Sequence, residues 1–150
     1  MKPRKETSRR ILLIDDNEEA MGHLADAIRV RGGDVVQVAS RRQAREAAKG
    51  RFDGIIVDLM FAPADDIPAR ESDSGFRGGA FIFEHDVRHL QPATPFVILT
   101  AVDKTTAVYR AGVEQLQQHK GFRGALEKPA TLGEILRLLH TEQGSGKRRG

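Results

Sequence analysis

The sequence predicts a doubly wound α/β domain with a five-stranded parallel sheet and helices on both faces. Five short apolar runs typical of strands alternate with five stretches that have helical periodicity. Such an alternation builds βα units, whose right-handed crossovers place helices on both sides of a parallel sheet. Ligands of these sheets bind beyond the carboxyl ends of the strands, and polar residues stand at most of those ends here.

The predicted strands are mostly continuous apolar runs, as expected for strands that are buried on both faces. The first and third are the runs ILLI and IIV, the second is rich in valine, and the fourth begins directly after Pro95. The strands are predicted at residues 11–14, 35–38, 55–57, 96–100 and 123–127. The helices between and after them are predicted at residues 18–31, 40–49, 80–90, 103–119 and 132–139.

Capping and stop signals support the predicted helices. The first helix has apolar residues at i, i+3, i+4 and i+7 spacing and stops at Gly32. The second and last helices begin with capping boxes, in which Ser40 is followed by Gln43 and Thr131 by Glu134.

Residues 59–79 are rich in proline, glycine, serine and aspartate, which is typical of a loop. Loops this long are usually functional or disordered. The segment follows the third strand directly, so we expect it to form a lid or a partner-specific surface beside the carboxyl edge of the sheet.

The composition excludes several classes of protein. Without cysteine, the chain has no disulfide scaffold, Cys-ligated zinc site or catalytic thiol. No apolar run approaches the roughly 20 residues that span a bilayer and no signal-peptide pattern is present, so we expect a cytoplasmic protein without membrane insertion. The net charge of +3 comes mainly from a basic tail at 1–9 and a flexible basic tail at 142–150. No base-reading motif accompanies the tails, so we do not expect nucleic acid as a partner.

Five polar residues mark the ends of four predicted strands. Asp15 and Asp16 end the first strand, Asp58 the third, Thr100 the fourth and Lys128 the fifth. In a doubly wound sheet these positions share one edge, so residues distant in sequence meet there. Crowded carboxylates repel one another, and a hard divalent cation such as Mg²⁺ relieves the repulsion. An anion such as a phosphoryl group fits between the metal and the lysine.

These segments together resemble the receiver domain of two-component response regulators. The matching segments are Ile11–Asp16, Ile55–Met60, Pro95–Ala101 and Lys128–Pro129. They occur in the family's order, each at its own strand end. The resemblance implies a receiver domain over residues 10–141, with the flavodoxin-like strand order 2-1-3-4-5.

The resemblance also implies a role for each site residue. Asp58 resembles the phosphoacceptor, a carboxylate nucleophile that attacks phosphorus and becomes an aspartyl-phosphate. Thr100 and Lys128 resemble the hydroxyl and the ammonium group that contact the phosphoryl group. The implied Mg²⁺ ligands are Asp15, Asp16, Asp58 and the backbone carbonyl of Met60.

Two features depart from the family pattern or suggest other chemistry. Ala125 stands where receivers usually have a tyrosine or phenylalanine that rotates inward when the threonine moves, and Phe122 or Tyr109 are the candidates to replace it. His85 and His89 nearly reproduce the zinc-binding pattern H-E-x-x-H, but no third ligand is evident. We therefore expect the two histidines to lie on a solvated helix face.

The sequence is thus interpreted as a stand-alone receiver in a phosphorelay, because only about ten residues follow the last helix. Its implied partners are a histidine kinase or a histidine phosphotransfer protein and a downstream target protein, and it is a phosphoacceptor and not an enzyme. One alternative is a receiver-fold binding module that signals without phosphorylation, which Ala125 and the long loop favour. A phosphatase of the haloacid dehalogenase type needs a second aspartate where Met60 stands.

Overall fold

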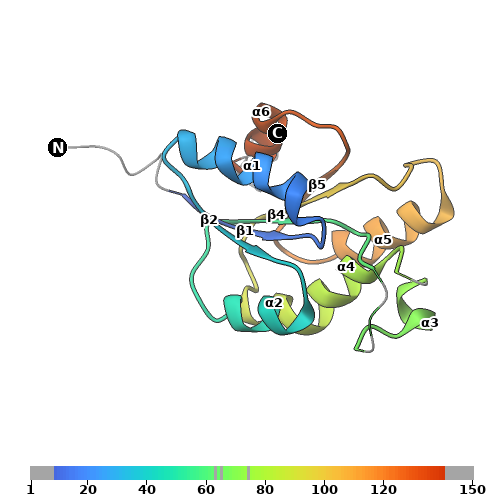
Figure 1. Ribbon diagram of the computed structural model, residues 1–150. Helices are drawn as coiled ribbons and strands as arrows, with labels where there is room; N and C mark the ends of the chain where they lie inside the picture. The colour runs from blue at the N-terminus through green and yellow to red at the C-terminus, as the bar shows by residue number, and fades with distance from the viewer. Residues whose placement is uncertain (1–8, 63, 65, 74, 141–150) are drawn as a thin grey trace, which may run out of the picture.

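The structure is a computed structural model that describes residues 9–62, 64, 66–73 and 75–140. One parallel sheet forms its centre, with the strand order β2-β1-β3-β4-β5 (Figure 1). The strands are β1 (Arg10–Ile14), β2 (Asp34–Val38), β3 (Gly54–Val57), β4 (Phe96–Thr100) and β5 (Phe122–Glu127). The predicted sheet and its strand order are therefore confirmed.

Helices cover both faces of the sheet, as the doubly wound prediction requires (Figure 1). α1 and α6 pack on one face, and α2, α4 and α5 pack on the other. The helices are α1 (Glu18–Val30), α2 (Arg41–Ala47), α4 (Gly78–Ile82), α5 (Ala107–Gln117) and α6 (Leu132–His140).

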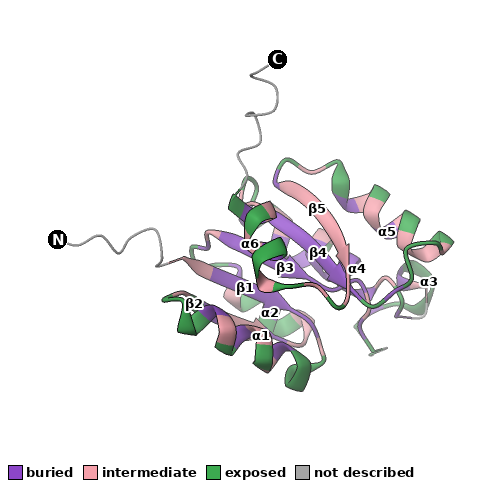
Figure 2. Cartoon of the chain, turned by 90° about the horizontal axis from the view of Figure 1, so that it is seen from above, coloured by how far each residue is buried: buried purple, intermediate pink, exposed green. Residues whose placement is uncertain are grey.

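The strands divide the apolar core into two layers. In β1, Leu12 and Ile14 face the layer under α2, while Ile11 and Leu13 face the layer under α1. β4 is buried along its whole length, whereas the edge strand β5 is half-buried throughout (Figure 2). Because Ile14 is in register with Val57, β1 and β3 end at the same edge of the sheet.

The capping box predicted at Thr131 is confirmed, whereas at Ser40 only the hydroxyl cap forms and the Gln43 side chain accepts a hydrogen bond from Ala39 N–H at 2.7 Å instead. The Ser40 hydroxyl accepts a hydrogen bond from the backbone N–H of Gln43 at 3.1 Å. The Thr131 hydroxyl accepts one from Glu134 N–H at 3.0 Å, and the Glu134 carboxylate accepts one from Thr131 N–H at 2.8 Å. Such caps satisfy donors that have no partner inside the helix, which fixes where α2 and α6 begin.

The segment predicted as a loop at 59–79 contains one short helix, α3 (Ala69–Ser72), and ends earlier than predicted. Its two ends are tied together, because Phe61 N–H donates to the Gly75 carbonyl at 2.9 Å and Gly79 N–H donates to the Leu59 carbonyl at 2.6 Å. The next helix therefore begins at Gly78. Gly78 packs closely on Phe61 and Gly79 on Asp58, and this packing outweighs the low helix propensity of glycine.

The helix predicted at 80–90 changes its winding twice. After α4 the chain continues as a π-helix over Phe83–Val87 and a 3₁₀-helix over Arg88–Leu90. Phe83 and Val87 remain buried in the core, so the change of winding keeps apolar side chains on the sheet. The π-helical turn also brings Asp86 into a buried position.

Both predicted basic tails lie outside the described residues, apart from Arg9. Within the described part of the chain, no helix combines the length and apolar character needed to cross a membrane.

Candidate functional site

Three segments meet at the carboxyl edge of the sheet. Asp15 follows β1, Asp58 follows β3 and Lys128 follows β5. The Lys128 Nζ lies 2.9 Å from Asp15 Oδ2 and 3.1 Å from Asp58 Oδ2. One ammonium group therefore bridges two carboxylates that are 43 positions apart in sequence.

Asp15 is held in place by hydrogen bonds to the backbone and is only 3% exposed. Its backbone N–H donates to the Val38 carbonyl at 3.1 Å, and its Oδ1 accepts from Asn17 N–H at 2.9 Å. Burial and the negative charge of Asp58 raise the pKa of Asp15 to about 6, against the lowering effects of Asn17 and Lys128. The site thus holds more negative charge than Lys128 balances.

Asp58 is fixed by backbone contacts on both sides. Its own N–H donates to the Ile14 carbonyl at 2.9 Å, which continues the pairing of β1 with β3. Its Oδ1 accepts from Met60 N–H at 3.1 Å, which leaves Oδ2 directed at Lys128. Behind it, a Cβ on residue 79 would collide with the Asp58 carbonyl oxygen, so only glycine fits at that position.

Lys128 is positioned by the end of β4. Its backbone N–H donates to the Thr100 carbonyl at 2.7 Å, and the Lys128–Pro129 peptide bond is cis. Burial alone lowers the pKa of Lys128, but the charges and hydrogen bonds of Asp58 and Asp15 outweigh this effect and raise it. The side chain is therefore a fixed positive charge at neutral pH.

Asp16, a predicted metal ligand, does not share the hydrogen bonds of Lys128. Its carboxylate accepts a hydrogen bond from the backbone N–H of Ala62, in the segment that follows β3. Among the residues that the structure describes, no three His, Cys, Asp or Glu side chains stand close enough together to hold a metal ion. The structure thus brings Asp15, Asp58 and Lys128 together and leaves Asp16 beside them.

The donor chemistry of the cluster still fits a hard divalent cation. Asp15 and Asp58 contribute two carboxylates against one ammonium group, so the cluster has a net charge of −1 before Asp16 is added. Carboxylate oxygens are the ligands that Mg²⁺ prefers. For Asp16 to join them, its carboxylate must give up the hydrogen bond from Ala62.

Thr100 lies at the same edge and is fully buried. Its Oγ1 accepts from Val102 N–H at 3.2 Å, which turns the chain out of β4. Beyond it, Met60, Ala101, Val102 and exposed Phe76 line part of a cavity of about 370 Å³. The side chains of Met60 and Val102 form an apolar part of the cavity wall.

The two candidate substitutes for an aromatic switch lie in different places, Phe122 on β5 beside the start of β4 and Tyr109 on α5 near Glu127. Ala125 is half-buried and in register with Ile98. Phe122 packs edge-on against Phe96 at a centroid distance of 5.7 Å, at the start of β4 and therefore far from its carboxyl end. Tyr109 is half-buried on α5 against the same core layer, where burial and then the charge of Glu127 raise its pKa.

The histidine pair does not form the geometry that its spacing suggested. His85 lies in the π-helix and His89 in the 3₁₀-helix, so the i, i+4 geometry of an α-helix is lost. The ring of His85 instead lies against that of Phe81, at a centroid distance of 4.2 Å. Both histidines are exposed, in agreement with the expected solvated face.

The sequence reasoning missed a second buried ionic cluster. Asp86 accepts from the Arg41 guanidinium at 2.7 and 3.0 Å and from Arg45 at 2.9 Å. Arg41 also donates to the Asp66 carbonyl at 2.7 Å and lies over the Phe81 ring at 5.0 Å. Asp86 lies between the two histidines in sequence, but nothing in a helical pattern indicates its burial, because that depends on the π-helical turn.

Comparison with known proteins gives one curated relative and many solved structures. No protein-family model matches the sequence. A response regulator receiver protein of Anaeromyxobacter sp. (strain Fw109-5) is 29% identical over 132 residues, which is 87% of this chain and 47% of that protein. The chain thus spans about half the length of this relative.

Solved structures match over nearly the whole chain. A response regulator protein from Burkholderia pseudomallei, crystallised with a phosphorylated aspartic acid, calcium ion and citrate, is 27% identical with a TM-score of 0.65. The match covers 95% of this chain and 71% of that one. The chain has the receiver fold of response regulators.

A second receiver shows the same fold at lower identity. The receiver domain of a sensor histidine kinase from Pseudomonas aeruginosa PAO1, with a magnesium ion in its active-site cleft, is 22% identical with a TM-score of 0.58. The match covers 88% of this chain and 94% of that receiver. The predicted resemblance to receivers is confirmed.

Proposed function

We propose that this receiver accepts a phosphoryl group on Asp58 and signals by contact with another protein. The observation that carries the proposal is the bridge from Lys128 Nζ to Asp15 Oδ2 and Asp58 Oδ2, at 2.9 and 3.1 Å. It joins a buried nucleophile, an electrostatic partner and a fixed positive charge at one sheet edge. The phosphorylated aspartic acid of the Burkholderia pseudomallei protein supports the same chemistry.

The chemistry follows from the charges of the chain's own residues. An Asp58 carboxylate oxygen attacks phosphorus, and the bond from phosphorus to the donor's leaving group breaks with its electron pair going to that group. Lys128 then pairs with a phosphoryl oxygen in place of Asp58 Oδ2. Thr100 is the last residue of β4 and carries that strand's single hydroxyl, which is the group we expect to contact the phosphoryl oxygens.

A magnesium ion completes the proposed site. When bound, Mg²⁺ neutralises phosphoryl charge and orients the donor. The residues that would hold it are Asp15, Asp16 and Asp58, with the backbone carbonyl of Met60. Of these, Asp16 must first exchange its hydrogen bond from Ala62.

The proposed partners are a histidine kinase or histidine phosphotransfer protein as donor and a downstream protein as target, acting in the cytoplasm within a phosphorelay. The receiver acts alone in this proposal and turns over no substrate of its own. A second candidate function is a binding module that signals without phosphorylation. Two observations favour it: Ala125 at the usual aromatic position and the contact of Asp16 with Ala62.

The test is incubation with acetyl phosphate and Mg²⁺, followed by intact-mass spectrometry. We expect one phosphoryl group per chain in the parent and none in Asp58→Asn. Asp26→Asn, which changes an exposed aspartate of α1, is the matched control and should label like the parent. Labelling of Asp58→Asn to the parent level would reject the phosphoacceptor role, and absence of labelling in all three proteins would favour the binding module.

A further inference from the structure

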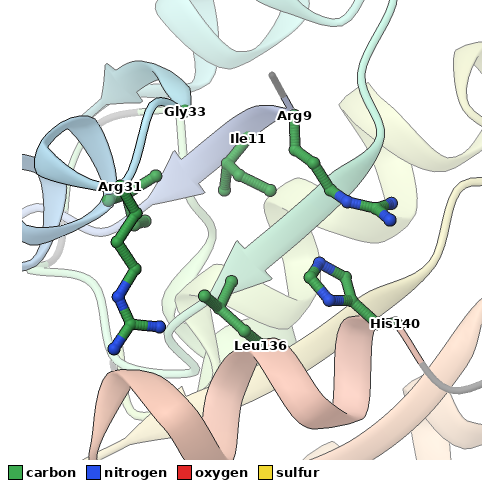
Figure 3. A pocket seen from close by; sticks show the side chains of 7 residues that line it. Arg9, Ile11, Arg31, Gly33, Leu136 and His140 are labelled. Atoms are coloured by element: carbon green, nitrogen blue, oxygen red, sulfur yellow. The ribbon is translucent and has the colours of Figure 1, made fainter. Parts of the chain in front are cut away.

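A small cavity lies at the amino end of the sheet, on the opposite edge from Asp58 (Figure 3). Its volume is about 140 Å³. It is formed by the start of β1, the end of α1 with the turn after it, and the end of α6. The lining residues are apolar on the floor (Ile11, Ile28 and Leu136) and basic at the rim (Arg9, Arg31 and His140), with Gly33 beside them.

The basic rim has no acidic counterpart within the described structure. Among residues 9–62, 64, 66–73 and 75–140, no carboxylate forms an ion pair with the side chain of Arg9 or Arg31. The nearby carboxylates of Asp34 and Asp53 bind Arg10 instead, at 3.3 Å through its Nε and at 2.9 Å through its backbone N–H. Within the described residues, the rim therefore presents positive charge that no carboxylate pairs.

Arg9 supplies the second, independent sign of a missing ligand. Its Nε is buried, and no atom of the described residues accepts a hydrogen bond from it. Buried donors nearly always have a partner, because an unpaired one has lost its hydrogen bond to water without a replacement. In Figure 3 the Arg9 guanidinium and the His140 ring lie close together on one side of the cavity, and Arg31 lies on the other.

Arg9 lies close enough to His140 for its charge to act on the imidazole. Burial and the charge of Arg9 both lower the pKa of His140. Basic residues at helix ends interact favourably with the helix dipole, which accounts for Arg31 after α1 and for His140 at the end of α6. That explanation does not extend to Arg9, which precedes a strand.

The floor of the cavity selects the kind of anion. Ile11 and Ile28 are buried apolar side chains, and Leu136 is half-buried between the basic groups. The volume is close to that of the engineered apolar cavity of about 150 Å³ that binds benzene. A Cβ at Gly33 would lie 2.7 Å from Ile28 Cγ2, so a larger residue there would press on the floor. A bare inorganic anion would leave the apolar floor uncovered.

We propose that this cavity binds a small amphipathic monocarboxylate. The carboxylate pairs with Arg9 and His140, and the short apolar body lies on Ile11 and Leu136. Arginine forms two parallel hydrogen bonds with a carboxylate, which gives the buried Nε the acceptor that it lacks. The site is separate from the phosphoacceptor edge, so the proposal does not depend on phosphorylation of Asp58.

The test is an NMR titration of the full chain with sodium benzoate, in which backbone amide shifts are followed. We expect saturable shifts of Ile11, Gly33 and Leu136 with a dissociation constant in the millimolar range or below. Benzamide, the neutral isostere, should bind at least about tenfold more weakly because it loses the charge-assisted pairing. Inorganic phosphate should bind more weakly than benzoate because it makes no apolar contact.

Two variants locate the site. Arg9→Gln and His140→Gln should each weaken benzoate binding about tenfold. Arg110→Gln, which changes an exposed arginine of α5, is the matched control and should bind benzoate like the parent. Far-UV circular dichroism confirms that each variant is folded. The proposal is overturned if benzoate gives no saturable shifts, if phosphate binds as tightly as benzoate, or if Arg9→Gln leaves binding unchanged.

Discussion

The domain contains two buried aspartate clusters that differ in charge balance. Asp86 lies between the guanidinium groups of Arg41 and Arg45, so one carboxylate meets two cations. At the carboxyl edge of the sheet the ratio is reversed, because the carboxylates of Asp15 and Asp58 share one ammonium group. The first cluster has all the counter-charge it needs within the chain, and the second does not.

The difference separates a structural role from a functional one. The Asp86 cluster joins α2, the π-helix and, through the Arg41 contact with the Asp66 carbonyl, the segment after β3. In the edge cluster, burial and then the charge of Asp58 raise the pKa of Asp15 to about 6, and perturbed pKa values of this kind cluster at functional sites. Buried charge is retained in both places, but only the second place has a deficit that a ligand can fill.

Breaking the balanced cluster should have the largest effect. Asp86→Ala leaves the mostly buried Arg41 without its carboxylate, and we expect a loss of about 3–5 kcal/mol in the free energy of unfolding. Urea denaturation measures it. The control is Arg45→Gln, because the Arg45 side chain is 50% exposed and should contribute about 1 kcal/mol or less. Equal losses in the two variants would contradict the structural role of Asp86.

The edge cluster should respond to pH in the opposite way to an ordinary salt bridge. The pKa of Asp15 is about 6 in the folded protein and 3.8 ordinarily, so the folded state binds the proton more tightly. Without divalent cations, the free energy of unfolding should therefore fall by up to about 3 kcal/mol as pH rises from about 4 to 6.

Urea denaturation in EDTA and in Mg²⁺, at pH 4, 6 and 7.5, checks this dependence. Because Mg²⁺ favours the ionised carboxylate, it should stabilise the protein more at the higher pH. Asp15→Asn should remove the dependence attributed to Asp15. A parent protein that gains stability between pH 4 and 6 in EDTA would show that the carboxylates are already balanced.

Removing the shared ammonium group tests its part in phosphoryl transfer. Lys128→Met should lower the rate of phosphoryl incorporation from acetyl phosphate about 100-fold, because one preorganised charge on the phosphoryl group is lost. Lys104→Met, which changes an exposed lysine, should label at the parent rate. If both variants label at the same rate, Lys128 has no part in phosphoryl transfer and only stabilises the carboxyl edge of the sheet.

The smallest effect concerns the lifetime of the phosphorylated form. Met60 lies two residues after Asp58, and Val102 lies two residues after Thr100. Both line the adjoining cavity. Neither side chain can orient water, so we expect slow loss of the phosphoryl group and a loss about 3–10-fold faster in Met60→Asn. Mass spectrometry of the phosphorylated protein over time measures the rate of loss. Val30→Asn, which changes an exposed residue of α1, is the control. Slower decay in Met60→Asn would overturn the prediction.

Periodicity and strand-end residues predicted the sheet and the meeting of Asp15, Asp58 and Lys128, and the resemblance to receivers predicted the strand order. These features depend on local patterns and on the topology of βα units. The position of Asp16 was missed because it depends on Ala62, in a loop whose path no pattern specifies. The burial of Asp86 was missed for a similar reason, since a single π-helical turn changes which side chains face the core.

The closed base of the segment after β3 has a consequence for protein engineering. Phe61 is paired with Gly75 and Leu59 with Gly79, so the chain leaves and re-enters the domain at neighbouring points. Loop-closure entropy rises only slowly with length once the ends are fixed. Within the excursion, residues 68–71 are exposed and are therefore where a foreign peptide could be inserted, while buried Ile67 and the strand that presents Asp58 keep their places.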